Sequence, residues 1–131
     1  MSKLGCACGN TIPDQTDNLP YKGHILPDVH HHAFFEWIAQ EAQSYVTAVR
    51  EGQTNAWLLR RFTRSYVDLK LSDADVLNDH IYAKFLEFKR DMYECDHCGR
   101  IHVETHKDNL FVSYAPDNQK TNSVLSDAPG D

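Results

Sequence analysis

Four cysteines carry the most specific chemistry in this 131-residue sequence. Cys6 and Cys8 form a CxCG motif near the start, and Cys95 and Cys98 form a CxxCG motif near the end. The short spacing lets two thiolates converge, and the glycine after each pair permits the backbone conformation that turns amide groups toward sulfur. Two such pairs supply the four sulfur ligands of a closed structural zinc site. The sequence therefore predicts one structural Zn²⁺ bound by Cys6, Cys8, Cys95 and Cys98.

Other uses of these cysteines fit the sequence less well. A thioredoxin-like redox pair opens a helix after a strand, whereas residues 99–104 alternate like a strand. A zinc deaminase has its H-x-E element before P-C-x-x-C, and here His102-Val103-Glu104 follows the cysteines. Iron–sulfur clusters also use four cysteines. The glycine after each pair favours zinc, and iron remains the alternative metal.

Composition narrows the class of protein. The chain has 13 basic and 19 acidic residues and therefore a formal charge of −6. This charge argues against nucleic-acid binding, because the phosphate backbone favours proteins with concentrated positive charge. Its 41% hydrophobic residues suffice for a core, and no stretch approaches the roughly 18–20 apolar residues of a membrane span. The first residues lack the apolar segment of a secretory signal. We therefore expect a cytoplasmic protein, in which cysteines stay reduced.

Histidines offer weaker metal-binding patterns. A run at residues 30–32 opens a predicted helix, where consecutive side chains diverge by about 100° and cannot converge on one ion. His102, Glu104 and His106 are spaced two residues apart and could share one face of a predicted strand. We expect this face to be the solvated outer face of a hairpin. The sequence assigns no role to His30, His31, His32, His102 and His106.

The middle of the chain predicts three helices. The first covers residues 28–50 with Asp28 as its cap, the second covers 54–69, and the third covers 73–88 after a capping box that begins at Ser72. Each carries an apolar stripe at helical spacing. The stripe positions are Phe34, Ile38, Tyr45 and Val49, then Leu58, Leu59, Phe62, Tyr66 and Leu69, then Val76, Leu77, Ile81, Phe85 and Phe88.

The two ends of the chain predict short strands and turns around the cysteine pairs. Prolines between residues 13 and 27 exclude a long helix there, and residues 101–114 predict a β-hairpin. The predicted fold class is therefore α+β, with a three-helix core inserted between the two halves of a small zinc-ribbon-like β element. We expect one zinc-clasped domain over residues 1–117, a helical insertion at about 28–90, and a polar C-terminal tail over 118–131.

Motifs at both ends of the chain resemble those of small, largely uncharacterised bacterial proteins with a split CxCG…CxxCGR zinc-binding pair. The matching residues are Cys6–Ile12 with Asp14, Leu19–Lys22, Tyr93–Arg100 and Tyr114–Pro116, within two end regions that together make up about a third of the chain. The resemblance implies a metal site at the two cysteine pairs. Small acidic bacterial proteins of this kind include immunity proteins, which neutralise a partner toxin; that link is an association of type and rests on no motif.

Three classes of function follow. The first is a non-enzymatic, immunity-type binding protein whose negative surface attracts a basic toxin domain, with contacts expected at Glu36, Glu41, Asp73, Asp79 and Tyr82. The second is a zinc-ribbon nucleic-acid-binding or transcription-associated protein, which would use Arg60, Arg61, Arg64 and Arg100. The third is an enzyme with an unrecognised site. The sequence contains no P-loop, G-x-G-x-x-G, G-x-S-x-G or H-E-x-x-H motif, which favours the first class.

Overall fold

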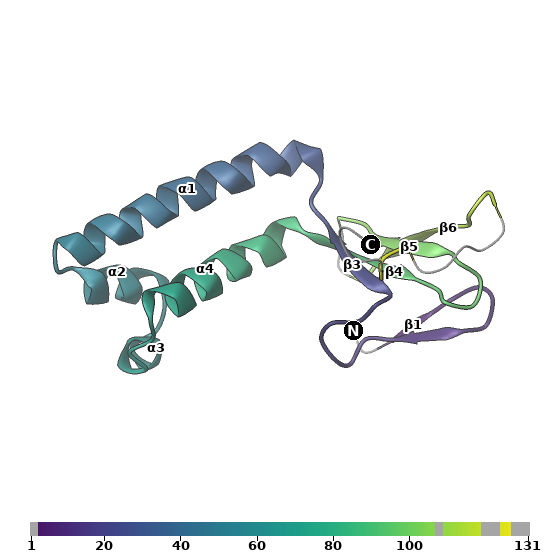
Figure 1. Ribbon diagram of the computed structural model, residues 1–131, viewed down its shortest axis with the longest axis horizontal. Helices are drawn as coiled ribbons and strands as arrows, with labels where there is room; N and C mark the ends of the chain where they lie inside the picture. The colour runs from purple at the N-terminus through teal and green to yellow at the C-terminus, as the bar shows by residue number, and fades with distance from the viewer. Residues whose placement is uncertain (1–2, 107–108, 119–123, 127–131) are drawn as a thin grey trace. The chain divides into compact units, whose positions relative to one another are not determined.

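The computed structural model describes residues 3–106, 109–118 and 124–126. Within them the chain forms four helices and two antiparallel sheets, so the predicted α+β class is confirmed. The chain divides into two compact units (Figure 1): a β unit made of residues 1–25 and 89–131, and a helical unit made of residues 26–88. Most of the predicted tail lies outside the described residues. None of the helices in the described part of the chain has the length and apolar character needed to cross a bilayer.

The β unit contains two sheets built from both ends of the chain. Strands β1 (Lys3–Gly5) and β2 (Thr11–Pro13) form a two-stranded sheet around the first cysteine pair. The second sheet has the order β3-β4-β5-β6. Its strands are β3 (Lys22–Ile25), β4 (Arg90–Glu94), β5 (Ile101–Glu104) and β6 (Phe111–Tyr114). The second cysteine pair lies in the turn between β4 and β5, and the predicted hairpin is the β5–β6 pair.

The prediction that His102 lies on the solvated outer face of this hairpin is wrong, because His102 is only 2% exposed. His102 lies opposite Tyr93 on β4 and Ser113 on β6, and Tyr93 belongs to the core of the β unit. The Nδ1 atom of His102 lies 2.5 Å from Oγ of Ser113. Burial, with a smaller contribution from the charge of Arg100, lowers the pKa of His102. This histidine is therefore a neutral core residue.

The helical unit contains four helices where the sequence predicts three. They are α1 (Asp28–Arg50), α2 (Thr54–Arg61), α3 (Arg64–Asp68) and α4 (Asp73–Phe88). The predicted second helix breaks because Phe62 adopts an extended backbone and Thr63 caps α3, its Oγ1 accepting a hydrogen bond from the Tyr66 amide. The break lets the rings of Phe62 and Tyr66 stack with centroids 4.0 Å apart.

Helix ends and stripes differ from the prediction at a few further positions. Pro27, not Asp28, occupies the N-cap of α1, whereas Ser72 does cap α4 by accepting from the Asp75 amide at 3.2 Å. On the predicted stripes, Val49 is 39% exposed while its neighbour Ala48 is buried. Leu59 and Leu69 are also exposed (44% and 62%). Leu59 directly follows the buried Leu58 in α2, so the two side chains point in different directions, and Leu69 lies just after the end of α3.

The core of the helical unit lies between α1, α2, α3 and the start of α4. Its buried members are Tyr45, Ala48, Trp57, Leu58, Val67 and Val76. The helices α1 and α4 also pack along each other (Figure 1), where Phe34 contacts the rings of Phe85 and Phe88. This core uses residues 26–88 alone, so the helical unit has its own apolar cluster without the metal-binding ends.

A polar network joins three of these helices. Glu41 on α1 accepts two hydrogen bonds from Arg61 on α2, at 2.8 and 3.2 Å, and its Oε1 lies 2.8 Å from Nε2 of His80 on α4. Arg61 also lies over the ring of Trp57 at 3.9 Å. Hydrogen bonds from Arg61 and then His80 lower the pKa of Glu41 to about 2, although burial acts in the opposite direction.

Replacing Glu41 with glutamine should lower the free energy of unfolding by about 1–3 kcal/mol, because the charged acceptor shared by two helices is lost. The native carboxylate has a lower pKa than the ordinary 4.5, so the unfolded chain binds more protons in acid. Its contribution is present above about pH 4.5 and lost as the pH falls toward 2. Urea denaturation at several pH values measures both effects.

The matched control for this prediction is Glu36→Gln, which removes the same charge from an exposed position on the same helix. It should leave stability nearly unchanged. Equal effects of the two substitutions would show that the network contributes nothing beyond surface charge.

Candidate metal centre

Two tight turns position the four cysteines. In the first turn the Cys6 amide donates to the Asn10 carbonyl (2.8 Å), and Gly9 has a φ of 97°. In the second, the Cys95 amide donates to the Arg100 carbonyl at the same distance. Gly99 has a φ of 79° there. Both glycines occupy the left-handed region that other residues rarely adopt. The predicted need for glycine after each pair is therefore met in both turns.

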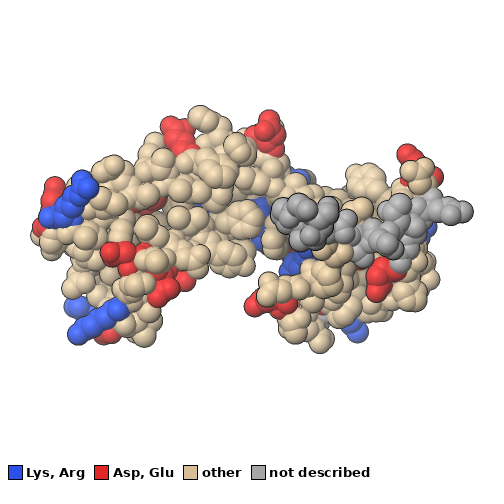
Figure 2. All heavy atoms as spheres, viewed as in Figure 1, with Lys and Arg blue, Asp and Glu red and all other residues tan. Residues whose placement is uncertain are grey.

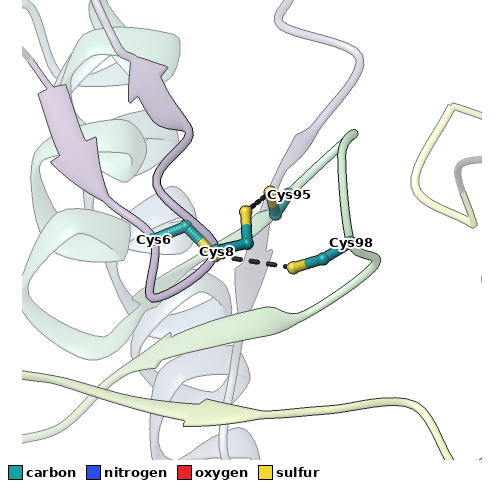
Figure 3. Close-up of side chains that lie close together, drawn as sticks. All are labelled: Cys6, Cys8, Cys95 and Cys98. Atoms are coloured by element: carbon teal, nitrogen blue, oxygen red, sulfur yellow. Dashed lines mark hydrogen bonds between the residues drawn. The ribbon is translucent and has the colours of Figure 1, made fainter.

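The four sulfur atoms converge on one point (Figure 3). Sγ of Cys6 lies 3.5 Å from Sγ of Cys98, and Sγ of Cys8 lies 3.6 Å from Sγ of Cys95. All four sulfurs lie within 4.8 Å of one another, and none forms a disulfide. A tetrahedral zinc ion with Zn–S bonds of about 2.3 Å places its sulfurs about 3.8 Å apart. The geometry thus fits one metal ion held by Cys6, Cys8, Cys95 and Cys98, as the sequence predicts.

The core of the β unit supports this centre from one side. Cys6 and Cys95 are buried together with Ile12 and Tyr93, which is 1% exposed. The Tyr93 hydroxyl donates to Asp14, which also pairs with Lys22 at 2.8 Å. Burial alone would raise the pKa of Asp14, but Lys22 and Tyr93 lower it overall. The charged Asp14 carboxylate, just after β2, therefore links the segment that follows the first cysteine turn to strands β3 and β4.

Two side chains donate hydrogen bonds directly to sulfur. Nη1 of Arg100 lies 3.2 Å from Sγ of Cys98, and Nδ2 of Asn10 lies 3.5 Å from Sγ of Cys95. Burial raises the pKa of Cys6 to about 12. Burial acts likewise on Cys98, but the amide and guanidinium groups of Arg100 outweigh it and lower the pKa of Cys98 to about 6. The surroundings of Cys98 therefore favour the thiolate, the form that binds a metal.

The sequence did not single out Asn10, and it assigned Arg100 to nucleic acid. Each of these residues directly follows the glycine of a cysteine pair. That shared position is the sequence signal that could have identified them, because in both turns the residue after the glycine places its side chain beside a cysteine sulfur. Such donors orient metal ligands and tune the charge on sulfur.

A centre of four thiolates has a closed coordination shell. Catalytic zinc keeps a position for water or substrate, whereas four sulfur ligands fill a tetrahedral ion. Among the described residues, no other group of three or more histidine, cysteine or carboxylate side chains converges in this way. The run His30–His32 accordingly forms no metal site in that part of the chain. The arrangement can hold a metal structurally.

The residues predicted to bind a partner have different surroundings. Glu36 and Tyr82 are exposed, whereas Glu41 is engaged by Arg61 and His80. Asp73 and Asp79 each accept a hydrogen bond from a tyrosine hydroxyl of the helical unit. Asp79 and Tyr82, three residues apart, share one exposed stripe of α4.

The four predicted arginines belong to two different units, with Arg60, Arg61 and Arg64 in the helical unit and Arg100 in the β unit. Arg60 and Arg64 are exposed, and Arg60 lines a surface crevice of about 280 Å³ beside Trp57. Arg61 pairs with Glu41, and Arg100 contacts the Cys98 sulfur. Two of the four guanidinium groups are thus committed to contacts inside their own units.

The fold and the site together define an α+β protein with a four-cysteine cluster that could hold one metal ion. The chain belongs to the family described as Domain of unknown function (DUF8617), which it matches over residues 2–118. That match covers both cysteine pairs and all four helices. No curated protein and no solved structure matches the chain.

Proposed function

We propose that this chain is a zinc-stabilised binding protein in which the metal has a structural role. The observation that carries the metal assignment is the closed set of four sulfurs at spacings a tetrahedral zinc ion requires. Two glycine turns with donors aimed at sulfur are typical of zinc sites, and iron is the competing metal for four thiolates. Four cysteines that form no disulfide also favour a reducing compartment, the cytoplasm.

The proposed activity is non-enzymatic binding. All four thiolates serve as metal ligands, and the closed shell leaves no position for an activated water or a substrate. The centre would also add negative charge, because Zn²⁺ offsets only two of four thiolate charges. An acidic chain of this kind attracts a basic protein partner.

The surface we propose for the partner is an exposed stripe of α4, formed by Asp75, Asp79, Tyr82 and Leu86. These residues recur every three or four positions and therefore share one side of the helix. All four are exposed, Tyr82 by 55% and Leu86 by 46%. Figure 2 shows acidic side chains gathered over the N-terminal half of α4. Carboxylates at one end and apolar side chains at the other suit a partner surface that is basic and partly apolar.

Neutralisation of a toxin, as immunity proteins do, is our proposal for what this binding accomplishes. The support is the charge of −6 and the proposed acidic stripe. Nucleic-acid binding is the second candidate, and it would depend on Arg60 and Arg64. The engagement of Arg61 and Arg100 weakens that candidate, because it removes two charges from the proposed basic set.

A pull-down from the source organism tests this proposal. We expect a basic protein to be recovered at low salt and lost as ionic strength rises, because salt screens exposed charges. The double variant Asp75→Asn with Asp79→Asn should recover several-fold less partner than the unmodified chain, since it removes two charges from the stripe.

The matched control is Asp17→Asn with Asp117→Asn, which removes two exposed charges from the β unit. If this control weakens recovery equally, net charge and not the α4 stripe attracts the partner. Recovery of nucleic acid in place of protein would contradict the proposed function and direct mutagenesis to Arg60 and Arg64.

A further inference from the structure

The four cysteines of the candidate metal centre differ in their exposure. Cys95 is fully buried and Cys6 is 8% exposed. Cys98 is half-buried, and Cys8 alone among the four is exposed. Cys8 lies at the tip of the CxCG turn, where one residue fewer separates the cysteines than in the second pair (Figure 3). Cys8 is therefore the cysteine of this centre that is most accessible to a reagent from solution.

The hydrogen-bond donors add to this difference. Arg100 donates to the Cys98 sulfur and Asn10 donates to the Cys95 sulfur. Within the described residues, no side-chain N–H group donates to the sulfur of Cys8 or of Cys6, and Cys6 is buried. A donor withdraws electron density from a thiolate and covers one of its approaches, and oxidation of cysteine follows thiolate character and access. Cys8 is therefore the one cysteine of the four that combines an exposed position with a sulfur that no side-chain donor covers.

We propose that Cys8 is a modification site, the sulfur at which the centre reacts with peroxides. The inference rests on the metal centre of the proposed function and adds a reactivity to it. The Cys8 thiolate attacks one oxygen of hydrogen peroxide, the O–O bond breaks, and hydroxide leaves to take up a proton as water. Cys8 becomes a sulfenic acid, two electrons having passed from sulfur to peroxide.

Cys95 is the thiolate that completes the reaction. Its sulfur lies 3.6 Å from that of Cys8, and it attacks the Cys8 sulfur so that an S–S bond forms and hydroxide leaves. In total, one peroxide, two thiolates and two protons give one disulfide and two waters. Only Cys6 and Cys98 remain as ligands, so peroxide should release the metal from the protein.

The experiment treats the full-length, zinc-loaded protein with hydrogen peroxide and traps sulfenic acid with dimedone. Mass-spectrometric mapping should find the first dimedone label on Cys8 and the first disulfide between Cys8 and Cys95. A chelating dye should record zinc release at the rate of disulfide formation. Cys8→His retains a zinc ligand and should slow release several-fold, whereas the matched variant Cys6→His should not.

Three results would overturn the proposal: a first label on another cysteine, a first disulfide between Cys6 and Cys98, or zinc release from Cys8→His at the unmodified rate. Elemental analysis before peroxide addition separates this inference from the metal assignment. A protein without zinc contradicts both. A zinc-loaded protein labelled first at another cysteine contradicts only the role of Cys8. Mapping is done on the unmodified chain, so it does not depend on a variant that folds.

Discussion

Replacing Cys95 with serine is expected to abolish stoichiometric zinc binding and to unfold the β unit. The unmodified protein should contain one zinc per chain, and the variant should contain almost none, because Cys95 is a fully buried member of the four-sulfur cluster. Structural zinc is worth roughly 10–16 kcal/mol in isolated finger peptides, and the short strands of the β unit offer little to replace it. Elemental analysis and two-dimensional NMR measure the two effects, with signals from residues 26–88 retained.

His97→Ser is the matched control for this substitution. It lies in the same turn, is exposed and supplies no sulfur, so it should keep zinc and the β-unit signals. A chelator should reproduce the effect of Cys95→Ser on the unmodified chain. Full zinc content in Cys95→Ser, or an intact β unit after chelation, would contradict a structural metal.

Replacing Trp57 with alanine should lower the free energy of unfolding of the helical unit by about 3–5 kcal/mol, the usual cost of removing a buried aromatic side chain. Trp57 is 5% exposed, contacts Tyr45 edge-on at 4.8 Å, and donates from Nε1 to Ser44. Its loss also removes the ring beneath Arg61. Urea denaturation followed by circular dichroism measures the change, and zinc content should stay at one per chain because every ligand lies in the β unit.

Leu59→Ala provides the comparison on the same helix. Leu59 is 44% exposed, and surface substitutions usually change stability by about 0.5 kcal/mol or less. A loss as large as that of Trp57→Ala would place Leu59 in the core. Loss of zinc from Trp57→Ala would contradict a metal centre that the β unit builds from its own residues.

The parts of this molecule that depend on local spacing could be predicted from the sequence. Each cysteine pair and its glycine define a turn by themselves, and the convergence of Cys6 with Cys98 was predictable because one pair supplies only half of the four sulfur ligands of a closed site. The α+β class, the cap at Ser72 and the β5–β6 hairpin likewise depend on neighbouring residues. Such features are set by backbone preferences within a few positions.

The features that the sequence predicted wrongly depend on side-chain contacts that an apolar periodicity does not reveal. An apolar stripe that continues through Phe62 favours one helix, but the stacking of Phe62 on Tyr66 and the Thr63 cap favour a break. His102 alternates as an outward residue would, yet its neighbour Tyr93 packs against Ile12 from the opposite end of the chain. Which face of a hairpin is buried is decided by what covers it, and periodicity alone does not contain that information.

The separation of the two cysteine pairs along the chain has a consequence for synthesis on the ribosome. Cys8 and Cys95 are 87 residues apart, and translation adds about 5–20 residues per second. The first two thiols therefore emerge about 4–17 s before their partners exist. During that interval the nascent chain exposes only two of the four metal ligands to cellular zinc, glutathione and oxidants. Residues 26–88 can fold before the second cysteine pair is made, because their core uses no residue outside that range. The order of folding should thus be helices first and metal capture last, with the first cysteine pair the segment most open to misligation.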